Sequence, residues 1–227
     1  SFGEPVRITA TGHLNGDGDI SDVERKAELA GNIHAKAMMI IQGYFTHTFA
    51  KPLPLPLSAN LVFEQSYGEI DGDSAALAGS CALLSVLSQT PIKQNIAVTG
   101  AIDQFGNVLA VGGINEKIEG FYRICELQQQ QDARVIIPAA NLVNLNLSAL
   151  LVDAVTAGKL TILPIDKIED AILLLMDKAA GELDDEETIY GIINKLAEDE
   201  DDEQNANIVT KLKLWYEKIA NKITSAN

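Results

Sequence analysis

The sequence predicts an α/β (α+β) sheet domain over residues 1–180, followed by an acidic helical C-terminal extension over residues 181–227. Three observations support this. Short apolar stretches typical of strands alternate with helical segments through the first 180 residues. The 227 residues are 47% hydrophobic and 22% charged, as in a globular protein with one large domain and an appendage. Finally, residues 182–203 hold 11 of the 32 acidic residues beside a single base, Lys195.

The first elements follow from alternation and turn residues. Residues 6–11 alternate apolar and polar side chains, which predicts a half-buried strand. Residues 12–19 are rich in Gly, Asn and Asp and predict a plain hairpin turn. A calcium loop is the alternative there, but the acidic positions do not complete the EF-hand pattern.

A helix, a connector and a strand come next. Residues 31–49 predict a helix whose apolar face consists of Ile33, Ala37, Ile40 and Ile41. Three alternating prolines exclude a helix over residues 51–57 and predict a rigid connector, with a polyproline ligand as the alternative. Residues 58–65 are rich in apolar side chains and predict a strand.

The strongest helix candidate covers residues 74–89, which are rich in Ala and Leu and have Pro91 just beyond their end. Asp73 or Ser74 is placed to cap this helix. Residues 95–102 then predict a strand that turns through a hairpin into a second strand at residues 107–111.

The remaining elements alternate in the same way. Gly112 and Gly113 end the preceding strand. Helices and short buried strands are then predicted in turn over residues 114–128, 134–138, 139–159, 160–164 and 168–178. Residues 186–225 predict two helices around an acidic loop at residues 198–203.

Charge and apolar runs exclude several classes of protein. The net charge of −15 leaves no basic face for a nucleic acid. No apolar run approaches the roughly 18 residues that a membrane span needs, and the start does not resemble a secretion signal. We therefore expect a cytoplasmic protein that binds neither nucleic acid nor membrane. Because Ser1 is not an initiator Met, we expect a fragment or a processed product.

The cysteines and histidines predict neither a disulfide framework nor a metal site. Cys81 and Cys125 form no CxxC pair, so we expect two buried free thiols. The three histidines show no HxH or HxxxH spacing, and no metal ligand is predicted. The Walker A, GxGxxG and GxSxG patterns do not occur, and no histidine has a flanking pattern that supports a Ser-His-Asp triad.

Ser74 is the first reactive candidate. It stands at the start of the Ala-rich helix, just after the flexible Gly72 and Asp73. Free backbone N–H groups and the positive end of the helix dipole lie at such a position and can hold an oxyanion. A serine at a helix start is more often only a cap.

Lys117 is the second candidate, one turn inside a helix that follows a Gly-Gly turn. A lysine can replace histidine as the base to a serine when burial lowers its pKa toward neutrality. Taken alone, a lysine on an amphipathic helix is ordinarily a surface residue.

Together these segments resemble the proteolytic domain of the Lon protease family, specifically its B-type and proteobacterial relatives. The resemblance depends on Glu-Ile-Asp-Gly-Asp-Ser-Ala at residues 69–75 and Val-Gly-Gly-Ile-Asn-Glu-Lys at residues 111–117. The strand Val-Thr-Gly-Ala-Ile-Asp at residues 98–103 and the segments at residues 1–10 and 32–36 also match. The resemblance covers about residues 1–180.

The resemblance implies a serine endopeptidase with Ser74 as nucleophile and Lys117 as general base. It also implies an ATP-dependent protease that degrades unfolded or misfolded proteins as a homo-hexameric ring. The implied fold is that of Lon proteolytic domains, which is related to a domain of a ribosomal protein and of small-molecule kinases. No cofactor is expected in this chain. ATP and Mg²⁺ would serve an AAA+ ATPase domain, in the same longer chain or in trans.

Four supporting residues accompany the pair. The Thr99 hydroxyl could orient the Lys117 amine, or could bond only to backbone. Gly72 gives flexibility before Ser74. Asp71 and Asp73 could pair with Lys117 in a resting state and raise its pKa. Asp73 replaces the proline, and Ala101 the usual glutamate, of A-type members.

Two other functions stay open at this point. A small-molecule kinase-like domain would share the fold, although residues 68–75 are a poor phosphate loop. A non-catalytic assembly module would share it too, although both reactive residues are present.

Overall fold

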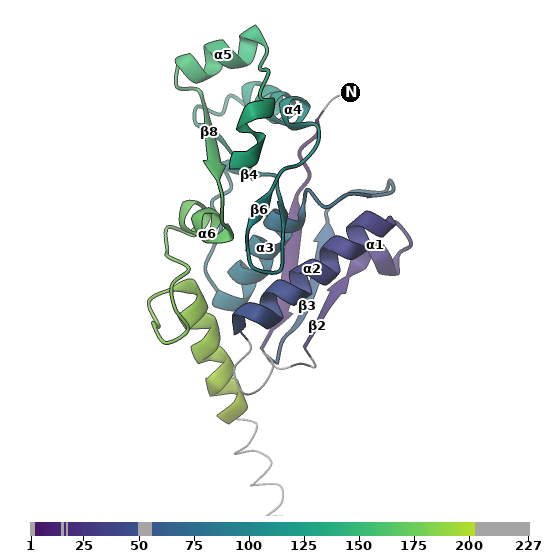
Figure 1. The fold of residues 1–227 in the computed structure, drawn as a ribbon, viewed down its shortest axis with the longest axis vertical. Coiled ribbons are helices and arrows are strands. Elements are labelled where there is room, and N and C mark those ends of the chain that lie inside the picture. Colours follow the sequence, from purple (N-terminus) through teal and green to yellow (C-terminus); the bar gives the residue numbers. More distant parts are fainter. Residues whose placement is uncertain (1–2, 15, 17, 50–55, 203–227) are drawn as a thin grey trace, which may run out of the picture.

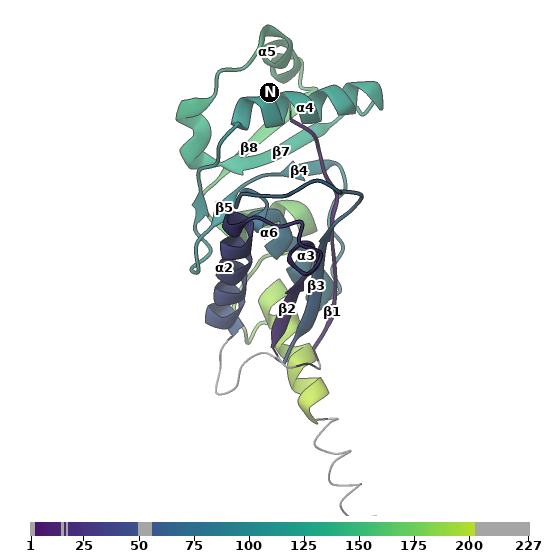
Figure 2. The same ribbon diagram turned by 90° about the vertical axis from the view of Figure 1, so that its right-hand side faces the viewer.

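The computed structural model describes residues 3–14, 16, 18–49 and 56–202. It has a mixed α/β architecture with one mixed and one parallel three-stranded sheet. The two sheets lie in opposite halves of an elongated molecule, and helices cover both (Figures 1 and 2). The N-terminal segment links the halves, because in both views it begins beside the helix α4 (Ile114–Leu127) and runs into the other half.

The mixed sheet has the strand order β1-β3-β2. β1 (Ile8–His13) is antiparallel to β3 (Ser58–Phe63), which confirms the two predicted strands at residues 6–11 and 58–65. β2 (Asp19–Asp22) is parallel to β3 on its other side. The predicted plain hairpin turn at residues 12–19 is therefore wrong, because β3 lies between β1 and β2.

Local backbone bonds explain that difference. The Gly16 and Gly18 N–H groups donate to the carbonyls of Pro56 and Leu57, at 2.9 Å each. These bonds carry the chain across the end of β3 before β2 begins. The predicted connector at residues 51–57 lies mostly outside the described residues.

Two helices follow β2. The short α1 (Val23–Lys26), which the sequence did not predict, is capped by Asp22. α2 (Asn32–Phe49) confirms the predicted helix, and Ala37 and Ile41 are buried as expected. Ile33, however, is 52% exposed, and the neighbouring His34 points inward instead. The prediction that Ile33 belongs to the apolar face is therefore wrong.

The Ala-rich helix α3 (Ala76–Ser88) begins two residues later than predicted. Its N-cap is Ala75, without a side-chain bond, so the prediction that Asp73 or Ser74 caps it is wrong. Ser74 and Ala75 instead form a turn. The helix ends at Ser88, and its C-cap, Gln89, has a left-handed backbone.

The second sheet is parallel, in the order β4-β7-β8, and consists of β4 (Ile96–Val98), β7 (Ala133–Pro138) and β8 (Leu160–Ile165). The predicted strand at residues 95–102 is interrupted at Thr99 and Gly100. The chain resumes as β5 (Ala101–Ile102), paired with β6 (Val108–Leu109), which confirms the hairpin.

Three further helical segments surround this sheet: η1 (Ala139–Asn144), α5 (Ala149–Thr156) and α6 (Ile168–Met176). Apolar residues of α4, β7, α5 and β8 form one core cluster. A larger cluster joins the mixed sheet to α2, α3 and α6. Cys81 lies in the larger cluster and Cys125 in the other, and both are free and buried, as predicted.

Of residues 181–227, predicted as an acidic helical extension, the structure describes residues 181–202, and residues 189–202 of these form a helix. Ile189 and Ile193 are fully buried in the larger core cluster. The expected acidic loop at residues 198–203 is wrong for residues 198–202, because they continue this helix. The second predicted helix falls outside the described residues. None of the described helices combines the length and the hydropathy needed to cross a membrane.

Candidate active site

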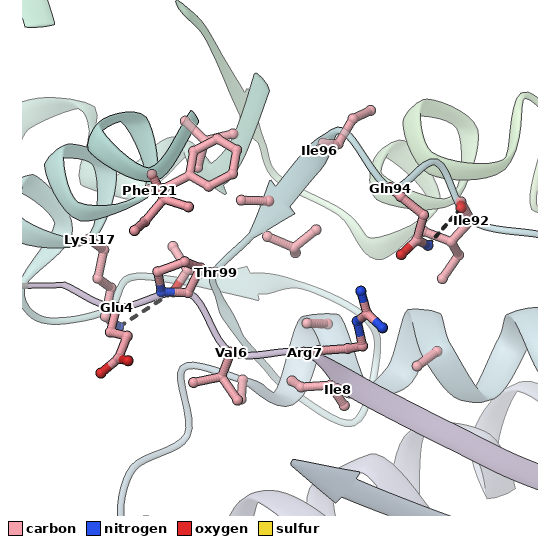
Figure 3. A pocket seen from close by; sticks show the side chains of 18 of the residues that line it. Glu4, Val6, Arg7, Ile8, Ile92, Gln94, Ile96, Thr99, Lys117 and Phe121 are labelled. Carbon is pink, nitrogen blue, oxygen red and sulfur yellow. Dashed lines mark hydrogen bonds between the residues drawn. The ribbon is translucent and has the colours of Figure 1, made fainter. Parts of the chain in front are cut away.

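An open cavity of about 640 Å³ brings Ser74, Thr99 and Lys117 together. The three residues come from different elements, namely the turn before α3, the end of β4 and the first turn of α4. Figure 3 shows the Lys117 side chain reaching from α4 toward Thr99. Residues 43 positions apart in the sequence, Ser74 and Lys117, thus line one site.

Backbone bonds at Gly100 fix the turn that carries Ser74. The Gly100 N–H donates to the Ser74 carbonyl at 2.8 Å, and the Gly100 carbonyl accepts from the Leu77 N–H at 3.1 Å. A Cβ at Gly100 would come within 2.9 Å of the Leu77 side chain and 3.2 Å of Val108. The strand is interrupted at Gly100 because its backbone bonds to Ser74 and Leu77, and these bonds dock the end of β4 against the start of α3.

Lys117 is positioned by the Gly-Gly turn. Gly113, at φ 66°, has a left-handed backbone that favours glycine, and it is the N-cap of α4. Lys117 closes the first turn with a bond from its N–H to the Gly113 carbonyl at 3.0 Å. The buried Asn141 fixes the chain just before this turn, since its side-chain amide exchanges two 2.9 Å bonds with the Val111 backbone.

Thr99 connects the two reactive residues. The Lys117 Nζ donates to Thr99 Oγ1 at 3.4 Å, and the same hydroxyl donates to the Ser74 carbonyl at 3.4 Å. Thr99 is only 8% exposed, so little water competes for its hydroxyl. Both contacts are long for hydrogen bonds, which describes a loosely joined arrangement.

Within the described part of the chain, no direct hydrogen bond joins Ser74 Oγ to Lys117 Nζ. Both residues nevertheless line the same cavity. Catalytic hydrogen bonds often tighten only when substrate binds. The absence of a direct bond in the described structure is therefore compatible with a Ser-Lys pair.

Burial and a neighbouring carboxylate shift the pKa of Lys117 in opposite directions. Desolvation lowers the pKa of its amine, while the negative charge of Asp73 acts in the opposite direction. The net pKa is lowered, so burial outweighs Asp73. Asp73 thus favours the ammonium form, as expected, but does not raise the pKa above its ordinary value.

The start of α3 offers backbone donors to the cavity. In the described structure, the N–H groups of Ser74 and Ala75 have no hydrogen-bond acceptor, whereas the Ala76 N–H donates to the Asp73 carbonyl. Ser74 and Ala75 both line the cavity. Two free N–H groups at the positive end of a helix are the donors that an oxyanion requires.

Asp71 does not contact Lys117, contrary to the expected resting pair. Its Oδ1 accepts hydrogen bonds from the Ile33 and His34 N–H groups, at 2.9 and 3.2 Å, and from the Gly72 N–H at 3.1 Å. The carboxylate therefore lies at the N-terminus of α2, where it stabilises the helix dipole. Gly72, at φ 126°, then turns the chain toward Ser74.

The N-terminal segment also takes part in the site, which no sequence pattern predicted. Residues 4–8 line the cavity, and Figure 3 shows Glu4, Val6 and Arg7 along the segment that passes below Thr99. A Cβ at Gly3 would lie 2.6 Å from Lys117 Cα, and one at Gly120 would overlap the Gly3 carbonyl. Paired glycines with 116 residues between them give no local pattern to read.

No metal site accompanies these residues in the described ranges, where no three His, Cys, Asp or Glu side chains are grouped to hold an ion.

Residues 4–178 match the family model of the Lon protease (S16) C-terminal proteolytic domain. Lon protease homologues of Escherichia coli K12 and of Haemophilus influenzae are each 51% identical over 178 residues, which is 78% of this chain and 30% of those proteins. The archaeal Lon protease of Methanocaldococcus jannaschii is 38% identical over 135 residues, which is 56% of this chain and 18% of that protein.

The chain thus spans well under half the length of the curated relatives it matches. The family model, in contrast, covers most of the chain, including all the residues of the cavity described above. The chain belongs to the Lon protease (S16) C-terminal proteolytic domain family.

Proposed function

We propose that this chain is a serine endopeptidase in which Ser74 is the nucleophile and Lys117 the general base. The observation that supports this most strongly is the shared cavity. It holds a serine beside a helix N-terminus and a lysine whose pKa is lowered by burial, with the Thr99 hydroxyl between them. These are the parts that acyl transfer by a Ser-Lys pair needs.

The reaction begins with the neutral Lys117 amine. Its lone pair takes the proton of the Ser74 hydroxyl as the serine oxygen attacks the carbonyl carbon of a peptide bond. The Thr99 hydroxyl accepts one N–H of the amine, so the lone pair can point toward Ser74. The free N–H groups of Ser74 and Ala75 bind the oxyanion, and such a donor is worth about 3–4 kcal/mol in the barrier.

The tetrahedral intermediate then collapses. Lys117 returns the proton to the leaving amine nitrogen, the C–N bond breaks, and an acyl-enzyme ester forms on Ser74. A water molecule enters, and Lys117 removes its proton as the water oxygen attacks the ester. The second collapse releases the carboxylic acid and returns the proton to Ser74, so the enzyme is regenerated.

A second part of the proposal concerns the substrates, assembly and location of the whole protein. We infer protein substrates, including unfolded or misfolded chains, a homo-hexameric ring and a cytoplasmic location. An AAA+ ATPase domain that uses ATP and Mg²⁺ would unfold the substrate, in the same longer chain or in trans. Family membership and the much greater length of the relatives support this inference.

A labelling and cleavage experiment tests the proposed activity. The chain is treated with a fluorophosphonate and, separately, with a fluorogenic peptide, alongside a Ser74→Ala variant as the matched control. We expect one adduct on Ser74 and peptide cleavage that the variant lacks. Cleavage that survives in Ser74→Ala would refute the proposed nucleophile. A folded chain that neither labels nor cleaves would favour the non-catalytic assembly module, and tight nucleotide binding would favour the kinase-like domain.

A further inference from the structure

We propose that Asp71 is a positioning residue for the nucleophile, and that its carboxylate fastens the serine turn to the N-terminus of α2. This inference rests on the proposed role of Ser74. It assigns Asp71 a part that depends on hydrogen-bond acceptance and not on its charge near Lys117.

The Asp71 carboxylate forms the first anchor of the serine turn. One carboxylate oxygen of Asp71 accepts from Ile33 and His34, two consecutive N–H groups of the first turn of α2. These N–H groups have no partner within the helix, because the first four N–H groups of any α-helix lack one. Asp71 therefore caps the N-terminus of α2, although it lies 38 residues away along the chain from Ile33.

Buried contacts of His34 hold the helix end to which Asp71 bonds. The His34 side chain, 4% exposed, lies 3.1 Å from the Asp22 carboxylate, which is 6% exposed. Its ring also meets the Phe63 ring edge-on, with centroids 5.4 Å apart. Asp22 in turn caps α1 by accepting from the Glu24 N–H at 3.1 Å. The buried His34 side chain thus holds the first turn of α2 against the core.

The backbone beside Asp71 is fixed as well. The Gly31 N–H donates to the Ile70 carbonyl and the Ile70 N–H to the Leu29 carbonyl, at 2.8 Å each. A side chain at Gly31 would overlap the Asp71 carboxylate. The close approach of the two segments therefore requires glycine at position 31.

The second anchor is Ser74 itself, whose carbonyl accepts from Gly100. Only residues 72 and 73 lie between the two anchors, and Gly72 takes a backbone conformation that few other residues adopt. Because both ends are held, the direction of the Ser74 side chain is set by the span. Loss of the Asp71 carboxylate would leave this end held only by the backbone bonds of Ile70, and the longer free span would let the nucleophile drift from Lys117.

The chemistry of the anchor predicts which substitutions it tolerates. Asparagine keeps a side-chain oxygen that accepts from backbone N–H groups, whereas alanine has none. A charge-dependent pair with Lys117 would fail equally in both variants. Asp71→Asn and Asp71→Ala therefore separate positioning from charge.

The experiment compares these variants for steady-state peptide cleavage and for the rate of fluorophosphonate labelling of Ser74. Asp103→Ala is the matched control. Asp103 also accepts two backbone N–H groups with one carboxylate oxygen, from Phe105 and Asn107 at 2.8 and 2.9 Å, but it does not line the cavity. It therefore reports the general effect of losing such a bond.

We expect Asp71→Ala to lower kcat and the labelling rate by roughly 10- to 100-fold, the range for small misplacements of a reacting group, with little change in KM. Asp71→Asn should recover most of that loss, to within about threefold of the unmodified chain, because a neutral acceptor bonds about half as strongly as a charged one. Asp103→Ala should leave both rates unchanged. Equal losses in Asp71→Asn and Asp71→Ala, or no loss in Asp71→Ala, would overturn the proposal.

A second readout does not depend on activity. Amide hydrogen exchange at Ile33 and His34 should speed up by about tenfold in Asp71→Ala and much less in Asp71→Asn, as one lost hydrogen bond predicts. Unchanged exchange in Asp71→Ala would contradict the anchor even if the enzyme were active. If the unmodified chain neither labels nor cleaves, the proposed function fails, and exchange alone then decides whether Asp71 fastens the turn.

Discussion

Replacing Thr99 by valine tests how the site joins its two reactive groups. Valine keeps the volume of threonine in this buried position and the backbone bond from the Thr99 N–H to Ile136. It removes only the hydroxyl, and with it both 3.4 Å contacts, to the Lys117 amine and to the Ser74 carbonyl. Thr99→Ser is the matched control, since it keeps the hydroxyl and loses a methyl group.

The size of the effect follows from those two contacts. A typical hydrogen bond is worth about 0.5–1.5 kcal/mol, and long ones lie at the lower end. Losing both should raise the barrier by about 1–2 kcal/mol, which corresponds to a roughly 5- to 30-fold lower kcat. Thr99→Ser should stay closer to the unmodified chain.

The assay is hydrolysis of a fluorogenic peptide over a range of concentrations, so that kcat and KM are separated. Thermal unfolding of each variant reports whether the fold is intact. A Thr99→Val enzyme with unchanged kcat would refute the bridging role. A Thr99→Ser enzyme as damaged as Thr99→Val would show that packing of the methyl group matters and not the hydroxyl.

Three further predictions concern the same site. Ser74→Ala and Lys117→Arg should each remove nearly all peptide cleavage, the latter because a guanidinium cannot act as a neutral base, and the double variant should be no worse in the same assay. Asp73→Asn removes the charge that raises the pKa of Lys117, so the acidic limb of the kcat/KM profile should move to lower pH; an unmoved limb would contradict this. Gly72→Ala places a side chain at φ 126° and should lower the free energy of unfolding, measured in urea, by about 1–3 kcal/mol; an unchanged midpoint would refute that strain.

Much of the fold could be predicted because its strongest elements are locally encoded. Short sequence patterns predict two helices: the Ala- and Leu-rich stretch predicts α3, and the glycine pair predicts the start of α4. Both elements formed close to the predicted bounds. The position of Lys117, one turn into α4, followed directly from the Gly113 turn.

The errors arose where long-range backbone bonds override a local pattern. The glycine-rich segment after β1 has the composition of a hairpin, yet bonds to Pro56 and Leu57 carry it across β3. Serine is a residue type typical of helix N-caps, yet the Gly100 N–H bonds to the Ser74 carbonyl and Ser74 stays in a turn. The acidic run at residues 198–202 is a different case, because it is exposed at every position and still continues the helix.

The arrangement around Asp71 could not be foreseen for the same reason. Two carboxylates, Asp71 and Asp73, flank the same turn at alternate positions, and the sequence offers no way to tell them apart. In the structure only Asp73 influences the pKa of Lys117, while Asp71 turns toward α2. The different roles of the two carboxylates depend on the position of the N-terminus of α2 in the fold, which no local sequence pattern predicts.

The most direct test of the Ser-Lys account is the rate at which a fluorophosphonate modifies Ser74 in the unmodified chain and in a Lys117→Met variant, with the adduct located by peptide mass. Methionine keeps an unbranched side chain but supplies no base. The account predicts a single adduct on Ser74 that forms in the unmodified chain and is nearly lost in Lys117→Met. Equal labelling in the two proteins, or an adduct on another residue, would contradict it.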